Sequence, residues 1–522
     1  MTETYSTPPG APTTVTAPAG TIRGLTADGV SVFRGIPYAV APTGSLRFAP
    51  PVACDPFSAV FDAASFGPIS IQDIDPLPIT LPGTEANFYH RNPVMSEDCL
   101  NLNIWSPNLQ GSAPVLVWIH GGAFMCGSGT GAWTDGSRYA QNHGIVVVSI
   151  NYRLGILGGL YLGDHSAGSA NFGLLDQIEA LRWVRRNIAA FGGDPDRVTV
   201  SGQSAGAMST ALLLASPLTT GLFRRAIVES GHLAANIDVD SALMMRNTIA
   251  RQLHLDPKAP DLVDQLRQLS TLRIMAAQRA NSIALAPFPS VTDGVSLPAD
   301  PLGSLAAGDK DGIELIVGIN EEENRLFDFT GWSRDPTVPL EQYLSAYVGT
   351  DDLPLAVALY RSIPGISDSD RCELAATDHD WGPAAQLADV YSSRGNTVFN
   401  YEFAWKSKAQ NGRLGSAHLV ELPFVFDNLH QPGVDDLLGD GIAADPGAER
   451  LAAAINAAWA GFIREGRPGP ELGRWTAYSP DRRATLIVDV EPRLVLDNKE
   501  DRLRFWANHR AHAPLSVILG KD

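Results

Sequence analysis

The sequence predicts an α/β protein with a large central sheet, mostly parallel and twisted, flanked by helices. Short runs of β-branched residues recur along the chain and are apolar almost throughout, which is typical of strands buried on both faces. Stretches with helical spacing of apolar residues lie between several of these runs, and strands that alternate with helices indicate a parallel sheet. The expected strands cover residues 115–120, 145–150, 197–201, 226–229, 313–319, 398–405 and 485–490.

Two helices are expected beside the strands in the middle of the chain. Residues 174–190 place Leu174, Ile178 and Leu181 at roughly helical spacing. Residues 208–215 are rich in Ala and Leu, which are good helix formers. Each helix lies next to an expected strand in the sequence, as the alternating pattern requires.

Nothing in the sequence divides the chain of 522 residues into separate domains, because it contains no repeat, long charged run or low-complexity linker. We expect a flexible lead-in over residues 1–18, which is rich in Thr, Pro and Ala, and a single domain over 19–522. Two segments without a clear strand, about 240–289 and 328–389, are expected to be helical insertions that cover the functional site of that domain.

Charge and composition exclude several kinds of partner. The formal net charge of −18 argues against nucleic acid and anionic membranes. The N-terminus has no Lys or Arg before Arg23 and no apolar core of a signal peptide, and no run of about 18 apolar residues exists. We therefore expect a cytoplasmic protein without a transmembrane helix. Four cysteines without a CxxC pair make a disulfide framework and a zinc site unexpected.

One short motif carries chemistry, the pentapeptide GQSAG at residues 202–206. By itself such a motif could be an ordinary glycine-rich turn with a surface serine. Here it directly follows an expected strand and precedes an expected helix, which is the setting of a nucleophile elbow. The glycines leave room for a strained serine whose hydroxyl stands near the positive end of the helix. This context predicts Ser204 as a nucleophile.

A nucleophilic serine needs a base, normally a histidine that a carboxylate orients. In this fold class the acid and then the histidine follow the serine in the chain. Three adjacent glutamates, 321–323, follow an expected strand, and spacing alone does not select one of them or exclude a solvated loop. Of the later histidines, His418 is the best placed after the next strand, and His430 is the fallback.

The attack of a serine on a carbonyl creates an oxyanion, which needs N–H donors that are already in place. One donor should come from Ala205, the residue after the nucleophile. Others should come from the glycine-rich segment 120–124, HGGAF, which follows the expected strand 115–120. The alternative is that this segment is a plain turn.

Longer motifs resemble the type-B carboxylesterases, a family that includes cholinesterases and bacterial para-nitrobenzyl esterases. Residues 97–103, EDCLNLN, resemble the family's EDCLxLN signature, and residues 191–195, FGGDP, resemble the start of its active-site serine signature. Residues 151–153, NYR, and 505–506, FW, match as well. The resemblance spans nearly the whole chain and is nearest the bacterial members. It implies an α/β-hydrolase fold with helical insertions that cap the active site.

The resemblance also implies a set of site residues. A pattern like GTNxDEG maps onto residues 318–324 and implies Glu323 as the acid. A pattern like GAxHxxELPYVF maps onto residues 415–426 and implies His418 as the base. The implied oxyanion donors are the N–H groups of Gly122, Ala123 and Ala205.

Further implied roles and two departures concern the surroundings of the acid. Ser230 resembles a second serine that supports the acid, and Glu97 with Arg153 resembles a buried structural ion pair of the family. Asn324 stands where the family usually has Gly, and Glu322 where it usually has Asp. The departures concern the shape of the acid loop.

These observations predict a serine carboxylesterase that hydrolyses carboxylic esters with short to medium acyl or aryl groups through an acyl-enzyme intermediate. The expected partner is a small-molecule ester, and neither a metal nor an organic cofactor is expected. The alternatives are an amide or carbamate hydrolase with the same triad and a non-catalytic interaction module of the same fold. Phe124 and Phe288, the latter within the apolar segment 284–290, are candidates for the substrate pocket, although Phe288 could equally belong to the core.

Overall fold

The computed structural model of the protein describes residues 10–73, 94–163, 170–281, 288–330, 338–497 and 499–509. Its strands in these ranges are β1 Ala11–Ala17, β2 Gly20–Ala27, β3 Val30–Pro37, β4 Phe61–Asp62, β5 Asn101–Ser106, β6 Ala113–Ile119, β7 Val146–Ile150, β8 Gly193–Gln203, β9 Arg225–Glu229, β10 Asn236–Ile237, β11 Ser290–Val291, β12 Glu314–Asn320, β13 Val398–Phe403, β14 Thr485–Val488 and β15 Arg493–Val495.

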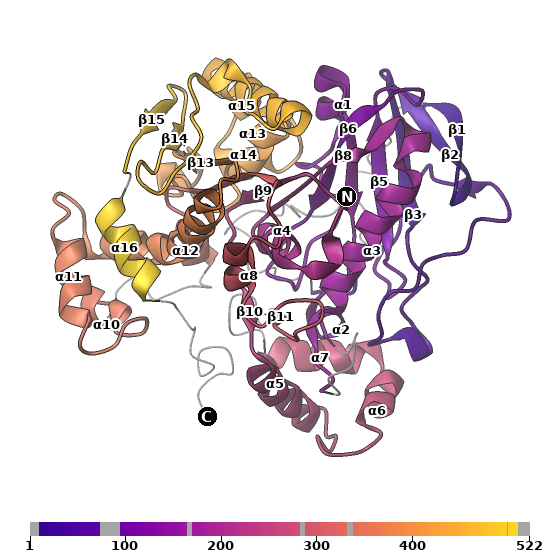
Figure 1. Ribbon diagram of the computed structural model, residues 1–522, viewed down its shortest axis with the longest axis horizontal. Helices are drawn as coiled ribbons and strands as arrows, with labels where there is room; N and C mark the ends of the chain where they lie inside the picture. The colour runs from indigo at the N-terminus through magenta and orange to yellow at the C-terminus, as the bar shows by residue number, and fades with distance from the viewer. Residues whose placement is uncertain are drawn as a thin grey trace.

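One 13-stranded sheet runs through the centre of the described part of the molecule (Figure 1). Its order is β1-β2-β3-β5-β7-β6-β8-β9-β12-β13-β14-β15, with β4 paired to β2. Every neighbouring pair from β7 to β14 in this order is parallel. The other pairs of this sheet are antiparallel, apart from β2 with β4. The strands β10 and β11 form a separate parallel pair. The predicted α/β class with a large, mostly parallel sheet is confirmed.

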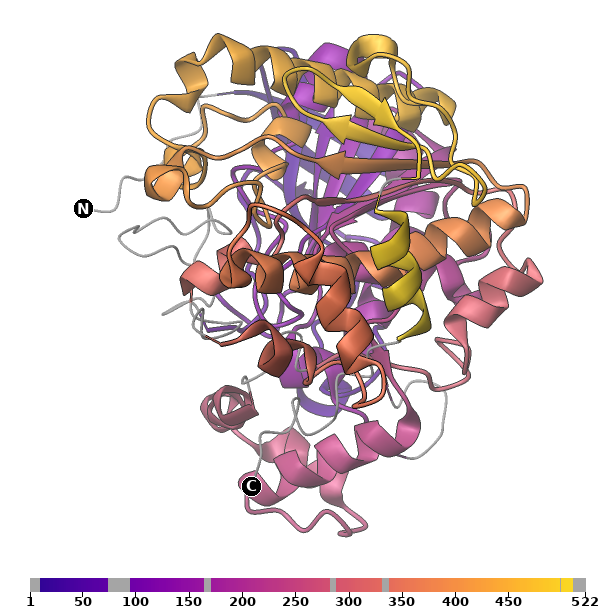
Figure 2. The same cartoon turned by 90° about the vertical axis from the view of Figure 1, so that its left-hand side faces the viewer.

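Helices cover this sheet on both faces and extend beyond its ends (Figures 1 and 2). In the described ranges they are α1 Ser137–His143, α2 Gly155–Gly159, α3 Phe172–Asn187, α4 Ala205–Ala215, α5 Val239–Gln252, α6 Leu262–Gln268, α7 Thr271–Asn281, α8 Pro301–Ala307, α9 Arg325–Thr330, α10 Leu340–Leu344, α11 Leu353–Arg361, α12 Asp368–Ser393, α13 Leu422–Val425, α14 Val434–Leu438, α15 Pro446–Glu465 and α16 Glu500–Asn508. Among them, none combines the length and the apolar character that crossing a bilayer requires.

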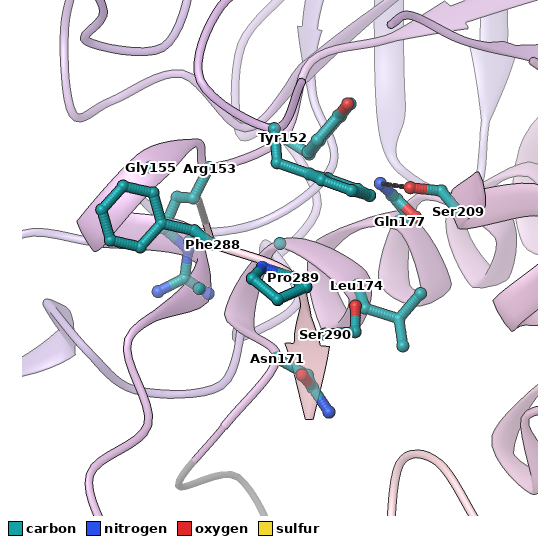
Figure 3. A pocket seen from close by; sticks show the side chains of 14 residues that line it. Tyr152, Arg153, Gly155, Asn171, Leu174, Gln177, Ser209, Phe288, Pro289 and Ser290 are labelled. Carbon is teal, nitrogen blue, oxygen red and sulfur yellow. Dashed lines mark hydrogen bonds between the residues drawn. The ribbon is translucent and has the colours of Figure 1, made fainter. Parts of the chain in front are cut away.

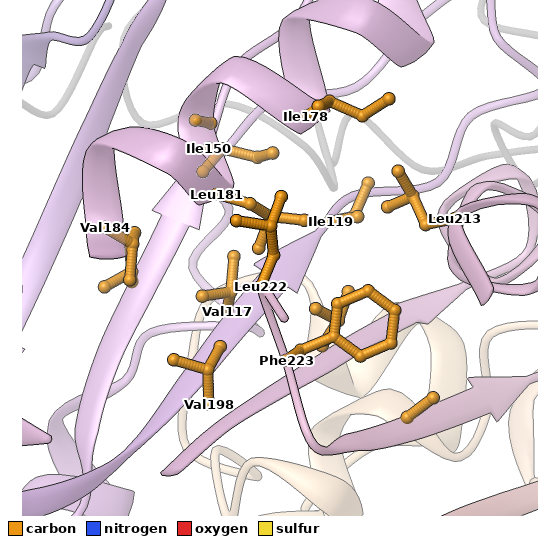
Figure 4. Packing of buried hydrophobic residues seen from close by; sticks show 14 of the residues in the cluster. Val117, Ile119, Ile150, Ile178, Leu181, Val184, Val198, Leu213, Leu222 and Phe223 are labelled. Atoms are coloured by element: carbon orange, nitrogen blue, oxygen red, sulfur yellow. The ribbon is translucent and has the colours of Figure 1, made fainter. Parts of the chain in front are cut away.

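The strand β6 shows why the central strands are apolar throughout. Val117 and Ile119 pack on one face of the sheet with α3 and α4, whereas Trp118 packs on the other face with α1, α13 and α15. Side chains alternate between the two faces of a strand, so a strand that is covered on both faces needs apolar residues at every position. Figure 4 shows the first of these faces, with Leu181 of α3 and Leu213 of α4 turned toward the sheet.

The N-terminal edge of the sheet differs from the prediction of a flexible lead-in over residues 1–18. Residues 11–17 form β1, which pairs with β2 in an antiparallel ladder from Ala11 opposite Thr26 to Ala17 opposite Gly20. The Thr and Val residues of this segment favour an extended chain, and Val15 is buried against the core. For this segment the Thr and Val residues, which favour a strand, were therefore a better guide than the Pro and Ala content on which the prediction of a flexible lead-in rested.

Helices occupy both segments that were expected to be helical insertions. The first contains α5, α6 and α7, which lie at the bottom of Figure 1 and pack around a buried cluster that also includes residues of α2. The second contains α10, α11 and α12, which lie at the left of Figure 1 around another cluster. That second cluster also holds residues of α16, so the C-terminal helix packs against the insertion (Figure 2).

The predicted ion pair between Glu97 and Arg153 is wrong. Arg153 instead forms a buried pair with Asp176 of α3, with 2.7 Å between Nη2 and Oδ1 and 2.8 Å between Nε and Oδ2. Glu97 accepts a hydrogen bond of 2.7 Å from Nε of Arg47. Arg153 and Glu97 thus pair with residues outside their own motifs, because the fold places Asp176 next to Arg153 and Arg47 next to Glu97.

Candidate active site

Ser204, the candidate nucleophile, lies in a sharp turn between β8 and α4. Its backbone has φ 56° and ψ −127°, a strained combination for a residue with a side chain. The turn is held because the N–H of Ser204 donates to the carbonyl of Glu229 over 2.9 Å, and its carbonyl accepts from the N–H of Met208 over 2.8 Å. The sequence GQSAG thus adopts the strand–turn–helix geometry of a nucleophile elbow.

Glycine is needed on both sides of Ser204. A Cβ atom on Gly206 would lie 2.0 Å from the carbonyl oxygen of Ile119 in β6. A Cβ atom on Gly202 would lie 2.4 Å from the carbonyl group of Gly206. Both obstacles are backbone atoms that cannot rotate away, so α4 can approach β6 this closely only if these positions lack side chains.

The predicted acid and base meet although 95 residues separate them in the chain. Glu323 follows β12, and His418 follows β13, which is the neighbour of β12 in the sheet. Oε2 of Glu323 lies 2.5 Å from Nδ1 of His418, and Oε1 accepts the N–H of Asn320 over 2.7 Å. Both side chains are buried. The carboxylate is fixed at both oxygens and in turn fixes the orientation of the imidazole.

The other candidates for acid and base have different contacts. Glu321 forms an ion pair with Lys406 over 2.5 Å at the surface. Glu322 pairs with the same Lys406 over 2.7 Å and accepts the N–H of Ser416 over 2.8 Å, which ties the acid loop to the histidine loop. His430 is exposed. Of the alternatives that the spacing left open, the structure brings together Glu323 and His418.

Charges around His418 favour its protonated form. Burial lowers the pKa of His418, but the charge and hydrogen bond of Glu323, with the charges of Glu421 and Asp380, outweigh burial and raise the pKa above its ordinary value. Burial and the charge of Glu323 raise the pKa of Glu421 to about 7. The amide of Asn320 donates to Glu421 and, over 2.7 Å, to the carbonyl of Ala417 next to His418. Protonation of Glu421 therefore removes a charge that raises the pKa of His418.

Gln203, directly before the nucleophile, contacts the second nitrogen of the imidazole. Its Nε2 lies 3.2 Å from Nε2 of His418, and its buried Oε1 has no hydrogen-bond partner among the described residues. The hydroxyl of Ser204 makes no hydrogen bond to a described residue. Catalytic hydrogen bonds of free enzymes commonly tighten only when substrate binds. Gln203 thus occupies the side of His418 that would receive the proton of Ser204.

The three predicted oxyanion donors lie beside the elbow. Gly121 brings the loop close to Ser204, because a Cβ atom there would lie 3.0 Å from Cβ of Ser204. Gly122 and Ala123 both have positive φ, 107° and 56°, which turns the loop after β6. The N–H groups of Gly122, Ala123 and Ala205 donate to no residue in the described part of the chain. Buried N–H groups are rarely left unpaired, so a row of free donors next to a serine fits an oxyanion.

The hydroxyl of Ser230, the predicted support of the acid, is buried and makes no hydrogen bond to a described residue. Its N–H donates over 2.8 Å to the carbonyl of Gly318 in β12. Ser230 therefore contacts the strand that leads to Glu323 through its backbone, while the predicted contact of its side chain with the acid is not observed.

Phe124 and Phe288, the two pocket candidates, line the same small hollow. Figure 3 shows this hollow with Phe288 labelled. The hollow has room for about one water molecule. Its wall includes Gly155 and the hydrogen-bonded pair Gln177 and Ser209, but none of the triad candidates. Phe288 is buried within the cluster of α5 to α7, so it belongs to the core, and residues 284–287 of the candidate segment lie outside the described residues. A substrate-binding role for Phe124 stays a prediction.

Several residues near His418 were missed by the sequence analysis. Asn320, Glu421 and Gln203 lie inside or next to the motifs that were used, so their positions could have suggested contacts with the triad. Asp380 lies on α12, in a segment expected only to be a helical insertion. Its placement depends on the packing of that helix against the sheet, for which no local pattern exists.

Most of the chain matches one group of known proteins. The model of a family described as the carboxylesterase family matches residues 11–357 and 369–506. The chain belongs to the carboxylesterase family. It is 36% identical to the para-nitrobenzyl esterase of Bacillus subtilis, over 94% of this chain and 97% of that protein. It is 35% identical to the phenmedipham hydrolase of Pseudarthrobacter oxydans, over 91% of this chain and 94% of that protein.

Solved structures of carboxylesterases share the architecture of this chain. A PNB esterase superimposes with a TM-score of 0.82 at 34% identity and covers 94% of this chain and 99% of its own. A carboxylesterase of Geobacillus stearothermophilus gives a TM-score of 0.82 at 34% identity, over 95% and 100% of the two chains. The predicted α/β-hydrolase fold and family resemblance are confirmed, and this carboxylesterase is a carboxylic-ester hydrolase.

Proposed function

We propose that this carboxylesterase hydrolyses esters with short to medium acyl or aryl groups through a triad of Ser204, His418 and Glu323. The observation that carries the proposal is the contact of 2.5 Å between His418 and Glu323. Gln203, directly before the serine of the strained elbow, lies 3.2 Å from the same imidazole. A buried imidazole that a carboxylate orients is a base for a serine alcohol, which alone is a poor nucleophile.

The proposed reaction has two steps. His418 takes the proton of Ser204 as its oxygen attacks the ester carbonyl, while the N–H groups of Gly122, Ala123 and Ala205 bind the oxyanion. The imidazolium, stabilised by Glu323, gives its proton to the leaving alcohol, and an acyl-enzyme remains. His418 then removes a proton from water, which attacks the acyl group and releases the acid and Ser204. No step of this scheme uses a metal or an organic cofactor.

Hydrolysis of amides or carbamates by the same triad is a second candidate, because acyl transfer uses the same groups for each. One relative of this chain is named phenmedipham hydrolase. Phenmedipham therefore belongs in the first substrate panel. The single catalytic domain over residues 19–522 and the cytoplasmic location stay predictions.

The test is hydrolysis of para-nitrophenyl esters from acetate to decanoate by the wild type and by Ser204→Ala. We expect turnover by the wild type and a loss of roughly 10⁴-fold or more in the variant, because no other group replaces the nucleophile. The length of the acyl chain that gives the highest kcat/KM indicates the size of the acyl pocket. Equal turnover by both proteins would exclude Ser204 as the nucleophile. A folded wild type that cleaves phenmedipham but no ester would favour the second candidate.

A further inference from the structure

Two loops bring the proposed acid and base together, and they follow neighbouring strands of the sheet. The acid loop, residues 321–324, follows β12 and contains Glu323, and the histidine loop, residues 404–418, follows β13 and ends at His418. The N–H of His418 donates to the carbonyl of Glu323 over 3.2 Å, in addition to the contact of their side chains. Because acid and base belong to separate loops, their geometry depends on how these loops are held against each other.

Glu322, directly before Glu323, binds the histidine loop through both its backbone and its side chain. Its N–H donates to the carbonyl of Ser416 over 3.0 Å, and its Oε2 accepts the N–H of Ser416 over 2.8 Å. Ser416 lies two residues before His418, and its hydroxyl donates over 2.6 Å to the carbonyl of Phe403, the last residue of β13. Glu322 therefore binds the histidine loop at a point where the loop is itself fixed to the sheet.

Two cations hold the carboxylate of Glu322. Nζ of Lys406, in the histidine loop, lies 2.7 Å from Oε2, and Nη2 of Arg325, the first residue of α9, lies 2.9 Å from Oε1. The side chain of Glu322 keeps only 16% of its surface exposed, although glutamates are mostly exposed. Burial raises the pKa of Glu322, but the two cations and the N–H of Ser416 outweigh burial and lower the pKa. The carboxylate is therefore ionised at neutral pH, and both of its oxygens are bound.

Gly415 leaves the space that this carboxylate occupies. A Cβ atom on Gly415 would lie 2.1 Å from Oε2 of Glu322, and Gly415 has φ 62°, a conformation that glycine adopts without strain. The carbonyl of Gly415 accepts the N–H of Ser407 over 3.0 Å, which joins the start of the histidine loop to the part that Glu322 binds. The course of the histidine loop is therefore matched to the carboxylate of Glu322.

We propose that Glu322 is a positioning residue of the ester hydrolysis, which holds the histidine loop so that Nδ1 of His418 stays in contact with Glu323. The inference rests on the proposed function, because it concerns the acid and the base of that reaction. Glu322 forms no hydrogen bond to His418 in the described part of the chain and acts on it through Ser416. Misplacing a catalytic group by about 1 Å can cost about 10²-fold in rate, so a small shift of the loop is enough to lower activity.

The kinetic test compares Glu322→Gln and Glu322→Ala with the wild type in the hydrolysis of para-nitrophenyl butyrate. Gln can still accept the N–H of Ser416 but has no charge for Lys406 and Arg325, whereas Ala loses all three contacts. Each kcat is taken on the plateau of that protein's own pH profile, where His418 is neutral, so that a shifted pKa does not enter. We expect kcat to fall about tenfold in Glu322→Gln and about 10²-fold in Glu322→Ala, while KM changes less than about twofold, because only the orientation of the base is altered.

Glu321→Gln is the matched control for the loss of charge. Glu321 directly precedes Glu322 in the acid loop and pairs with the same Lys406 over 2.5 Å, but its carboxylate forms no hydrogen bond to Ser416 among the described residues. The variant therefore removes one negative charge and leaves the bond between the two loops. Its kcat and KM should stay within about twofold of the wild type, because exposed ion pairs contribute little.

A second readout follows the contact itself and does not depend on turnover. The proton on Nδ1 of His418 lies in a short, charge-assisted hydrogen bond to Glu323, and such protons give ¹H resonances far downfield of the backbone amides. The resonance is assigned by its change in Glu323→Gln. We expect it in the wild type and in Glu321→Gln, whereas in Glu322→Ala it should move upfield or exchange with water too rapidly to be seen.

The outcomes separate the positioning role from the function on which it rests. An unchanged resonance or an unchanged plateau kcat in Glu322→Ala would overturn the positioning role and leave the esterase intact. An equal fall of kcat in Glu321→Gln would overturn it as well, because the charge of the loop would then be the cause. If the wild type cleaves no para-nitrophenyl ester, the proposed function fails, and the resonance alone decides whether Glu322 holds the contact. If Glu322→Ala does not fold, Glu322→Gln is judged by the same two readouts.

Discussion

At the scale of single residues, Glu323 influences the protonation of His418. The base of the proposed reaction must be neutral to accept the proton of Ser204, so activity is lost as the pH falls through the pKa of His418. Burial alone lowers this pKa, and the charge of Glu323 is the largest of the effects that raise it. In the proposed reaction we therefore expect Glu323 to set the lower pH limit of activity in addition to orienting the imidazole.

Replacing Glu323 by Gln should lower kcat and also move the acid limb of the pH profile. The amide has no charge, so the pKa of His418 falls and the limb of kcat/KM shifts to lower pH. Because the imidazolium loses its counter-charge, kcat should fall roughly 10²–10⁴-fold. The measurement is the pH dependence of para-nitrophenyl ester hydrolysis by wild type and variant. A limb that stays in place or moves to higher pH would contradict this role.

Glu321→Gln is the control for this prediction. Glu321 lies two residues from Glu323 in the same loop, yet its carboxylate pairs with Lys406 at the surface and does not contact His418. Its loss should leave both kcat and the acid limb as in the wild type. A shift of similar size in both variants would mean that the total charge of the loop, and not Glu323 itself, sets the pKa.

The sequence could predict the residues that local motifs contain, but not those that reach the site from elsewhere. Ser204 and the glycines around it belong to one tight turn, so their spacing in the sequence predicts that turn. Three glutamates in a row gave no such information, because the register of the loop decides which of them faces His418. Asp380 was missed since its position depends on how α12 packs, which involves contacts across the whole insertion.

At the scale of elements, the elbow depends on how closely α4 approaches β6. The distance is set by backbone atoms, since the missing Cβ of Gly206 would lie 2.0 Å from the carbonyl oxygen of Ile119. The same contact positions the N–H of Ala205 next to the loop that follows β6. Packing of these two elements thus positions the proposed nucleophile and the proposed oxyanion donor Ala205 together.

Gly206→Ala should force α4 away from β6 and disturb Ser204. We expect a lower Tm and a loss of labelling by a fluorophosphonate, because the reagent needs an activated serine and intact oxyanion donors. Gly349→Ala is the matched control, since a Cβ atom at Gly349 would meet nothing within 4 Å. Full labelling and an unchanged Tm for Gly206→Ala would show that the elbow can absorb a side chain.

Elements buried on both faces were predictable, whereas those at the edge were not. The central strands are apolar at every position because helices cover both faces, and this pattern is visible in the sequence. The strand β1 has one exposed face and contains Pro12, so its composition resembled a loop. Its hydrogen bonds are made with β2, and a pattern within residues 11–17 alone does not show them.

At the scale of the whole molecule, buried charges join distant parts of the chain. Asp378 of α12 is buried, lies 3.0 Å from Arg502 of the C-terminal helix α16, and accepts a hydrogen bond of 2.9 Å from the hydroxyl of Tyr360. Trp506 of α16 donates to the same hydroxyl over 2.6 Å. Neither this network nor the pair of Arg153 with Asp176 could be read from the sequence, because the partners come from separate elements.

Arg502→Met should destabilise the protein in a pH-dependent way. Burial raises the pKa of Asp378, and the charges of Arg502 and Lys499 with the bond of Tyr360 limit this rise. Without Arg502 the pKa rises further, so the folded state holds a proton that the unfolded state releases, and stability falls as the pH rises above the ordinary carboxyl range. Removing one partner of a buried pair costs about 3 kcal/mol. The Tm deficit of Arg502→Met relative to the wild type should therefore be larger at pH 8 than at pH 5.

Arg504→Met on the same helix is the control. Arg504 is exposed and pairs with Glu500 at the surface, where such pairs add little to stability. Thermal unfolding followed by circular dichroism at the two pH values should give this control the Tm of the wild type. If Arg502→Met showed the same deficit at both pH values, the loss would come from packing of the long side chain, and the charge of Asp378 would not be what ties α16 to α12.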